Sequence, residues 1–150
     1  MNIQVKKLHP KDIGKFTELI RVFEEVFEMK NFKIPEEKYL IQLLAKEDLI
    51  VFVGVLDNKV VGGLTSYTLQ QYYSVSPLVF IYDIAVKTEV QRQGIAKLLI
   101  TNLSDYCKDN GYEEMFVLAD EADTHAIEFY RSTGATEDRV VNFNYALNKN

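Results

Sequence analysis

The stretch VFIYDIAVKTEVQRQGIAKLLITNLSDY, residues 79–106, decides the fold that we expect for this chain. Its first eight residues, 79–86, are rich in β-branched and aromatic side chains, which is typical of a buried strand. After a short polar connection and a turn with Gly94, apolar residues recur at helical spacing from Ile95 to Tyr106. The sequence therefore predicts a strand, a glycine-bearing turn and a helix in immediate succession.

The start of that helix has the properties of an anion-binding site. The first turn of a helix has unpaired backbone N–H groups and carries partial positive charge from the helix dipole. Gly94 has no Cβ and lets a phosphate approach the backbone, and Arg92 and Lys97 add positive charge beside it. The spacing matches neither Gly-x-x-x-x-Gly-Lys-Ser/Thr nor Gly-x-Gly-x-x-Gly. These residues alone leave two interpretations open, a phosphate site and an ordinary helix start.

Two motifs resemble those of the Gcn5-related N-acetyltransferase (GNAT) family. Gln91-x-x-Gly94-x-Ala96, which follows Ile84-Ala85-Val86, is similar to the family's acetyl-CoA signature. Asp123-x-x-Ala126-x-x-Phe129-Tyr130-x-x-x-Gly134-Ala135 is similar to its penultimate helix and the following turn, where many members have Asn in place of Asp123. Residues 81–86, 92–96 and 119–120 look most like the aminoglycoside 3-N-acetyltransferases.

The resemblance implies a fold and a cofactor. The expected fold is α/β (α+β), a single domain over residues 1–150. It has a mixed central sheet of six to seven strands, helices on both faces and a splayed pair of central strands. The expected cofactor is acetyl-CoA, with its pyrophosphate on the backbone N–H groups of residues 92–97 and its pantetheine arm paired with residues 84–86. The cofactor-binding residues that the resemblance implies are Ile84, Ala85, Val86, Gln91, Arg92, Gln93, Gly94, Ile95, Ala96, Lys97, Asp123, Ala126 and Tyr130.

Two residues are candidates for catalysis. The family commonly has a tyrosine at the position of Tyr130, where a phenol can protonate the departing thiolate; the alternative role of Tyr130 is packing beside Phe129. Asp83 is the candidate base, or an anchor for a substrate ammonium, because an acid inside an apolar strand is unfavourable to bury without a partner. In an alternating strand Asp83 faces opposite to Tyr82 and Ile84. The alternative for Asp83 is a side chain hydrogen-bonded inside the sheet.

Three more carboxylates, Asp120, Glu121 and Asp123, follow the strand expected after the helix. They are candidates to line an acceptor cleft and hold a polyamine-like substrate. The alternative is that they solvate a loop and cap the next helix, for which Asp123 or Thr124 is suited.

Composition limits the partners of this chain. Its 150 residues, 47% hydrophobic and 26% charged, are typical of one globular domain. A net charge of −5 argues against nucleic acid and suits a cationic small molecule. No run is long enough to span a membrane, no signal peptide is evident, and one cysteine fits a reducing cytoplasm. Two histidines and the cysteine lack metal-ligand spacing, so we expect no metal.

The remaining elements follow from periodicity and turn residues. We expect strands at 2–8, 49–56, 60–69, 115–119 and 139–147, and helices at 13–27, 36–46 and after Asp123. Gly62-Gly63 inside a strand predicts a bulge or a close approach of backbone or ligand.

From these residues and the resemblance we expect a cytoplasmic acetyl-CoA-dependent N-acetyltransferase, an acyltransferase linked to antibiotic resistance. Its expected acceptor is the 3-amino group of an aminoglycoside, attacked directly in a ternary complex, and a homodimer is possible. The alternatives are an acetyltransferase that acts on a polyamine or a protein amine, and a CoA-binding module without catalysis.

Overall fold

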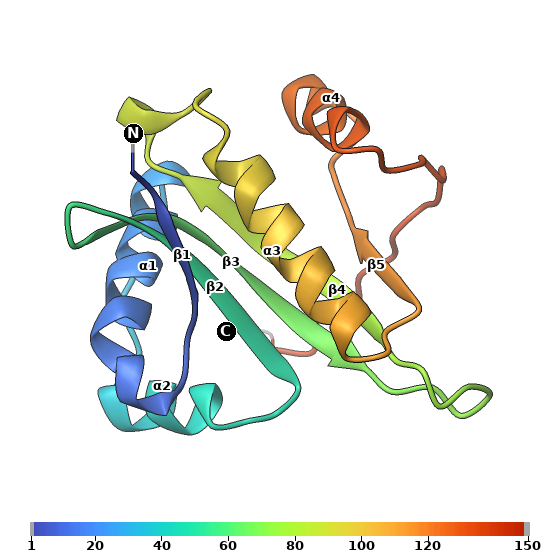
Figure 1. Cartoon of the computed structure of the whole chain (residues 1–150), viewed down its shortest axis with the longest axis horizontal. Coiled ribbons are helices and arrows are strands. Elements are labelled where there is room, and N and C mark those ends of the chain that lie inside the picture. The colour runs from blue at the N-terminus through green and yellow to red at the C-terminus, as the bar shows by residue number, and fades with distance from the viewer. Residues whose placement is uncertain (1, 149–150) are drawn as a thin grey trace. The chain divides into compact units, whose positions relative to one another are not determined.

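The computed structural model describes residues 2–148 and separates into two compact units, residues 1–118 and 119–150 (Figure 1). The first unit contains nearly all of the regular secondary structure. Its strands are β1 (Gln4–Lys7), β2 (Leu49–Leu56), β3 (Lys59–Leu69), β4 (Leu78–Val86) and β5 (Glu114–Val117). Its helices are α1 (Ile13–Val26), α2 (Glu37–Leu44) and α3 (Ile95–Asp109). Each of these elements lies where the sequence predicts one.

The five strands form one mixed sheet in the order β1-β2-β3-β4-β5. Neighbours pair antiparallel from β1 to β4. The tight turn at Asp57-Asn58 joins β2 to β3, whereas α1 and α2 lie between β1 and β2 in the chain. β5 pairs parallel to β4, since α3 carries the chain back across the sheet before β5 begins. The mixed α/β class is as expected, but the described residues form five strands instead of the expected six to seven.

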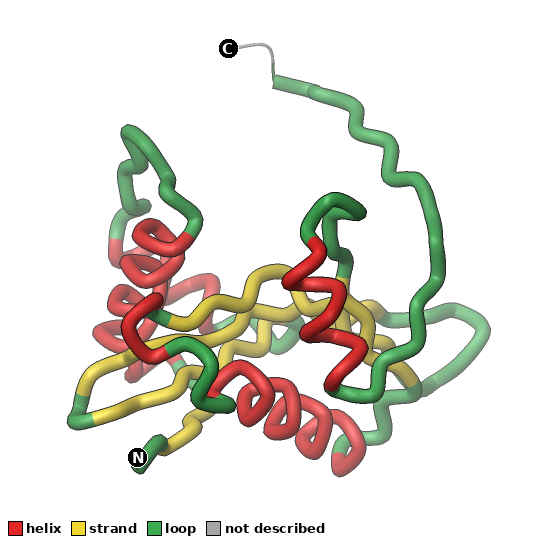
Figure 2. The backbone as a smooth tube through the Cα atoms, turned by 90° about the horizontal axis from the view of Figure 1, so that it is seen from above, coloured by secondary structure: helices red, strands yellow, loops and turns green. Residues whose placement is uncertain are grey.

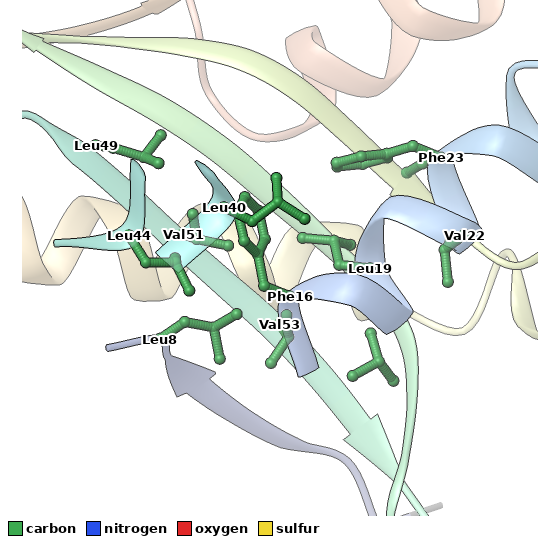
Figure 3. Close-up of a cluster of buried hydrophobic side chains, with 12 residues drawn as sticks. Leu8, Phe16, Leu19, Val22, Phe23, Leu40, Leu44, Leu49, Val51 and Val53 are labelled. Carbon is green, nitrogen blue, oxygen red and sulfur yellow. The ribbon is translucent and has the colours of Figure 1, made fainter. Parts of the chain in front are cut away.

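Helices cover both faces of this sheet (Figure 2). On one face, Phe16 and Leu19 of α1 and Leu40 of α2 pack with Val51 and Val53 of β2 in a cluster of buried apolar residues (Figure 3). On the other face α3 buries Leu99 and Leu103 completely, and its Tyr106 ring meets the Phe52 ring edge-on at 6.2 Å. The apolar stripe of each helix therefore accounts for its position.

Gly62 and Gly63 are required by close contacts on both sides of β3. A Cβ at Gly62 would lie 2.8 Å from the carbonyl oxygen of Ala85 in β4, and one at Gly63 would lie 2.6 Å from Cδ1 of Leu19. The pairing of β2 with β3 also shifts by one residue next to Gly62. The prediction of a bulge or a close approach at this pair is confirmed, and the approaching groups are β4 and α1.

The second unit contains one helix, α4 (Thr124–Ser132), followed by a segment without regular structure. The expected strand at 139–147 is wrong for the single copy of the chain. Residues 136–148 form no strand, and the side chains of its alternating apolar residues are exposed, from 74% at Val140 to 93% at Leu147. An alternating pattern fits a strand only where a partner strand supplies hydrogen bonds, and within the described residues this segment has none.

Among the residues described, no helix has the combination of length and apolar character that would let it cross a membrane.

Candidate active site

The turn before α3 has an unusual backbone. Gly94, the N-cap residue of α3, has φ 83°, and Arg92 two residues earlier has φ 64°. Both angles lie in the left-handed region, which glycine adopts without strain and which reverses the direction of successive N–H groups. A Cβ built on Gly94 would meet no atom within 4 Å, so the glycine is not required by packing inside the chain. Its conformation and the open space around it leave room for a ligand.

The backbone N–H groups of this turn are available to an anion. Within the described part of the chain, none of the N–H groups of residues 92–97 donates a hydrogen bond, and no side chain caps the helix. Leu98 is the first to donate, to the carbonyl oxygen of Gly94 at 3.0 Å. The side chains of Arg92, Gln93 and Lys97 are exposed beside these groups, whereas Ile95 is buried and offers only its backbone. Unpaired donors and two cations at a helix N-terminus form a site suited to phosphate.

The Gln91 side chain makes a hydrogen bond within the first unit. Its side-chain Nε2 donates to the carbonyl oxygen of Val86 at 2.9 Å, which ties the turn to the end of β4. In this position Gln91 acts on the shape of the turn, because its amide group holds the strand and the following residues together.

β4 and β5 separate halfway along β4. Their parallel pairing runs from Leu78 with Glu114 to Ile81 with Val117 and ends there, while β4 continues to Val86 in register with β3. Residues 82–86 therefore have a strand partner on the β3 side only. Because successive N–H groups of a strand point to opposite sides, about half of those in residues 82–86 lack a strand partner. The splayed central pair expected from the sequence is confirmed, and its open side contains Ile84, Ala85 and Val86.

A bulge in β4 changes the direction of Asp83. Thr65 of β3 pairs with Asp83 and the next residue, Ser66, pairs with Ile81, so Tyr82 is an extra residue on β4. The Tyr82 ring contacts the Tyr67 ring at 5.7 Å, and directly paired residues such as Thr65 and Asp83 share a face of the sheet. The expectation that Asp83 faces opposite to Tyr82 is therefore wrong. Both lie on the α1 and α2 face, because the bulge interrupts the alternation.

Asp83 is a half-buried carboxylate without a partner. In the part of the chain that the structure describes, it takes part in no hydrogen bond and no ion pair, and burial raises the pKa of its carboxyl above the ordinary value of 3.8. The alternative role for Asp83, a side chain hydrogen-bonded inside the sheet, is therefore wrong within the described residues. Opposite it, the Thr65 hydroxyl is buried and also lacks a hydrogen-bond partner within the described residues, with 9% of Thr65 exposed. Two polar groups without partners face the same side of one strand pair.

A set of aromatic rings, here called the aromatic patch, extends from Asp83 along the same face. Phe80 stacks on Phe116 at 4.9 Å and meets Tyr82 edge-on at 6.1 Å. The Tyr67 phenol is next to Tyr82, and its pKa is raised by burial and by the neighbouring Tyr82, Tyr39, Asp48 and Asp83. Sequence reasoning missed this patch and Thr65, because it treated residues 79–86 as uniformly buried. The available signal was the number of aromatic residues in β3, β4 and β5. The patch consists of Tyr39, Tyr67, Phe80, Tyr82 and Phe116.

In the second unit, the predicted substrate acids make local contacts. Asp123 is the N-cap of α4, and its Oδ1 accepts from the Ala126 N–H at 3.0 Å. Asp120 Oδ1 accepts from the Ala122 N–H at 2.8 Å, which closes the preceding turn. Glu121 is highly exposed and lies 3.6 Å from the guanidinium of Arg139. The capping and loop interactions that the sequence offered as the alternative are therefore present for Asp120 and Asp123, and each keeps a second carboxylate oxygen with which it can bind.

Tyr130 lies in the last full turn of α4. Its ring packs against that of Phe129 at 5.2 Å, and its backbone carbonyl accepts from the Thr133 hydroxyl at 2.6 Å. The Tyr130 side chain is half-buried, like that of Ala126 one turn earlier.

The structure thus brings together one part of the predicted site. Asp83, Ile84, Ala85, Val86 and the turn 91–97 follow one another along β4 and into α3, within the first unit. The residues predicted from the second motif, Asp123, Ala126 and Tyr130, belong to the second unit, as do the predicted substrate acids Asp120 and Glu121. Among residues 2–148 there is no cluster of three or more His, Cys, Asp or Glu side chains that would hold a metal ion.

Comparison with known proteins agrees with this geometry. Residues 16–135 match the model of the acetyltransferase (GNAT) family. An aminoglycoside acetyltransferase from an uncultured soil metagenomic sample, meta-AAC0020, is 52% identical in its complex with trehalose, with a TM-score of 0.95 and 97% of each chain covered. The same protein has also been solved with sisomicin, at 51% identity. A second aminoglycoside acetyltransferase from soil, HMB0005, is 29% identical over 99% of this chain, with a TM-score of 0.93. No curated protein matches the chain.

More distant structures share the fold alone. The aminoglycoside N-acetyltransferase AAC(6')-Iy, solved with CoA, is 18% identical with a TM-score of 0.72. GNAT enzymes use acetyl-CoA as the acetyl donor, and the residues of this chain fit that cofactor: unpaired N–H groups for the diphosphate and an open strand for the pantetheine arm. The family match over residues 16–135, the splayed strands and the glycine turn identify this chain as a GNAT acetyltransferase.

Proposed function

We propose that this acetyltransferase transfers the acetyl group of acetyl-CoA to an amine of an aminoglycoside, most specifically the 3-amino group, by direct attack in a ternary complex. The observation that carries the proposal is the carboxylate of Asp83, which is half-buried, unpaired within the described residues and next to the open half of β4. The likeness to a 52% identical aminoglycoside acetyltransferase supports the class of acceptor.

Backbone N–H groups would bind most of the cofactor. The N–H groups of residues 92–97 would bind the diphosphate, with Arg92 and Lys97 adding charge. Residues 84–86 would pair with the pantetheine arm as a neighbouring strand does. One of their free N–H groups, for which Ile84 is the candidate, would donate to the thioester carbonyl and stabilise the charge that develops there. Acetyl-CoA itself supplies the activated acyl group.

Asp83 would act on the acceptor amine as a general base. Because burial raises its pKa, the ionised carboxylate is a stronger base than an exposed aspartate and is better able to take a proton from the attacking ammonium. The Thr65 hydroxyl opposite is suited to hold the amine or a water molecule between them. The aromatic patch offers ring faces to the sugar rings and ammonium groups of a polycation.

The second unit would complete the reaction. Tyr130 is the proposed acid that protonates the departing thiolate, as its place in the family motif suggests. Asp120, Glu121 and Asp123 would bind further ammonium groups of the acceptor through their free carboxylate oxygens. The family match, over residues 16–135, includes residues of both units, which supports the proposal of one catalytic domain. We also propose that the enzyme works in the cytoplasm, in keeping with its single cysteine, which is buried.

A polyamine or a protein amine is the second candidate acceptor, because an acidic, aromatic face also suits those cations. A CoA-binding module without catalysis is the third. It is less well supported, since an unpaired half-buried carboxylate destabilises a protein and has no evident use in a module that only binds.

A panel of amines tests the proposal. Sisomicin, spermidine and a lysine peptide are incubated with acetyl-CoA, and release of free thiol is followed. We expect the highest kcat/KM for sisomicin, and nuclear magnetic resonance of the product identifies the acetylated nitrogen. Acetylation at another amine would remove the 3-N assignment, and no turnover with any amine would favour the binding module.

In the same assay, variants of the acidic residues separate binding of the acceptor from the catalytic step. Asp120→Asn and Glu121→Gln should raise KM for sisomicin and leave the affinity for acetyl-CoA unchanged. The rise in KM should be larger at low salt, because exposed charge pairs are screened as ionic strength increases. Unchanged KM in the double variant would show that these acids only shape their loop.

A further inference from the structure

Two buried hydroxyl groups follow one another along β3, and only one of them has a hydrogen-bond partner. Ser66 is completely buried, and its Oγ donates to the carbonyl oxygen of Ile50 at 2.9 Å. Thr65 is 9% exposed, and its Oγ1 makes no hydrogen bond within the described residues. A buried hydroxyl without a partner lowers the stability of a protein. The fold therefore accounts for the hydroxyl of Ser66 and gives no reason for that of Thr65.

The two hydroxyls lie on opposite faces of the sheet. Thr65 pairs with Val51 of β2, which belongs to the buried cluster that α1 and α2 form with β2 (Figure 3). Ser66 pairs with Ile50, the neighbour of Val51. Paired residues share a face and successive residues of a strand alternate, so Thr65 is on the face of α1 and α2 and Ser66 on the other. Of the two, only Thr65 is on the face that carries Asp83.

The Asp83 carboxylate is the polar group that the Thr65 hydroxyl can reach. The two residues are direct partners across β3 and β4. Directly opposite residues have Cβ atoms about 4.5–5.5 Å apart, a separation that a hydroxyl and a carboxylate can bridge. Because Asp83 makes no hydrogen bond or ion pair within the described residues, no such contact fixes the orientation of its carboxylate. A change of its side-chain rotamer can bring one carboxylate oxygen to the Thr65 hydroxyl.

We propose that Thr65 is a positioning residue for Asp83: when an acceptor is bound, the Thr65 hydroxyl donates to one carboxylate oxygen and turns the other toward the amine. This role rests on the proposed function, because it requires an acceptor amine that Asp83 deprotonates. A hydroxyl has one hydrogen to donate, and a carboxylate oxygen accepts it well. The unpartnered hydroxyl thus has its use in the complex, where it holds the base in the orientation that proton transfer needs.

The hydroxyl hydrogen stays on Thr65 throughout the reaction. The free carboxylate oxygen of Asp83 takes one proton from the acceptor ammonium, and the nitrogen keeps the electron pair with which it attacks the thioester carbon. A C–N bond forms, the C–S bond breaks, and the nitrogen loses its second proton to water. Tyr130 protonates the departing thiolate, and exchange with water returns Asp83 and Tyr130 to their starting states.

The two neighbouring hydroxyls supply a matched pair of variants. Thr65→Val keeps the branched shape of the side chain, and with sisomicin as acceptor it should lower kcat roughly tenfold, as for one hydrogen bond to a charged group, with KM for acetyl-CoA unchanged. Its Tm should rise by roughly 2–4 °C, because a methyl group replaces an unpartnered hydroxyl. Ser66→Ala should do the opposite, with the parent's kcat and a Tm lower by roughly 2–4 °C.

Opposite changes in turnover and stability separate positioning from a structural role. Thr65→Ser, which keeps the hydroxyl, should restore kcat to within about threefold of the parent. A Thr65→Val variant with the parent's kcat, or one in which Tm falls together with kcat, would overturn the proposal. So would a Thr65→Ser variant as slow as Thr65→Val.

A double-mutant cycle shows whether Thr65 acts through Asp83. In an Asp83→Asn background, Thr65→Val should change the residual kcat by less than about twofold, because the base that it positions is already absent. The same loss in both backgrounds would show independent roles and contradict the proposal. If another amine of the panel is the better acceptor, the cycle is measured with that amine. A parent that acetylates no amine would refute the proposed function and this role with it, whereas an active parent with an equally active Thr65→Val variant would refute this role alone.

Discussion

Gly94 allows the proposed diphosphate site to be tested with a control from the same helix. Gly94 and Gly111 lie at opposite ends of α3, both have positive φ, 83° and 76°, and a Cβ on either meets no atom within 4 Å. Any residue other than glycine is therefore strained by a similar amount at both positions, roughly 1–2 kcal/mol. For a chain of this size that corresponds to a fall in Tm of roughly 2–4 °C per kcal/mol. Only Gly94 lies in the proposed binding turn.

Gly94→Asp adds a negative charge where two negative charges of the cofactor should bind. Two unit charges 4 Å apart repel by about 1 kcal/mol in bulk water and more where water is excluded, so an exposed turn loses about 2 kcal/mol for the diphosphate. Since 1.4 kcal/mol is a factor of ten, the Kd for acetyl-CoA should rise roughly 10- to 30-fold.

Isothermal titration of both variants with acetyl-CoA measures this difference. Gly111→Asp, at the negative end of the helix dipole, should lose at least as much stability as Gly94→Asp and keep the parent affinity. A weaker complex for Gly94→Asp therefore cannot be attributed to unfolding. Equal Kd values for the two variants would refute the diphosphate site at this turn.

Three further substitutions test the chemistry and the packing. Tyr130→Phe should lower kcat roughly 10²-fold with little change in KM or Tm, and a fully active variant would reduce Tyr130 to packing. Asp83→Asn should lower kcat by a similar factor. Asp83→Asn should also be more stable than the parent near neutral pH, because folding raises the pKa of Asp83. The parent has its full free energy of unfolding below the pKa of Asp83 in the unfolded chain, about 3.9, and loses part of it as pH rises through the higher pKa of the folded protein. Urea unfolding at several pH values checks this, and a stability difference independent of pH would contradict it. Gly63→Ala should destabilise by about 1–3 kcal/mol, because the new methyl group meets the Phe52 carbonyl at 2.7 Å, and an unchanged urea midpoint would show that β3 can shift.

Periodicity was enough to predict the elements of the first unit, because each helix has one apolar stripe and each strand a run of β-branched residues. The glycine turn followed from its motif and the splay from the family. The bulge at Tyr82 could not be predicted, since nothing in the amino-acid sequence of β4 shows that one residue is skipped in its pairing with β3. That single shift puts Asp83 on the same face as Tyr82, beside Tyr67 of the aromatic patch.

At residues 139–147 the sequence predicted a strand that the structure does not have. Its alternation describes a strand correctly in chemical terms, but a strand exists only with a partner, and a pattern in one chain does not say where the partner comes from. The roles of Asp120 and Asp123 were equally open, because a carboxylate that caps a helix and one that binds an ammonium look the same in sequence.

The early end of the β4–β5 pairing has a consequence for how such an enzyme changes over time. If residues 84–86 hold the cofactor through main-chain groups, substitutions there that keep the backbone in place leave recognition of the cofactor intact. The side chains around Asp83 have no such protection, and in the proposed site they are the ones that would meet the acceptor. A lineage can therefore acquire a new antibiotic specificity by exchanging side chains, without first losing and regaining its acetyl donor.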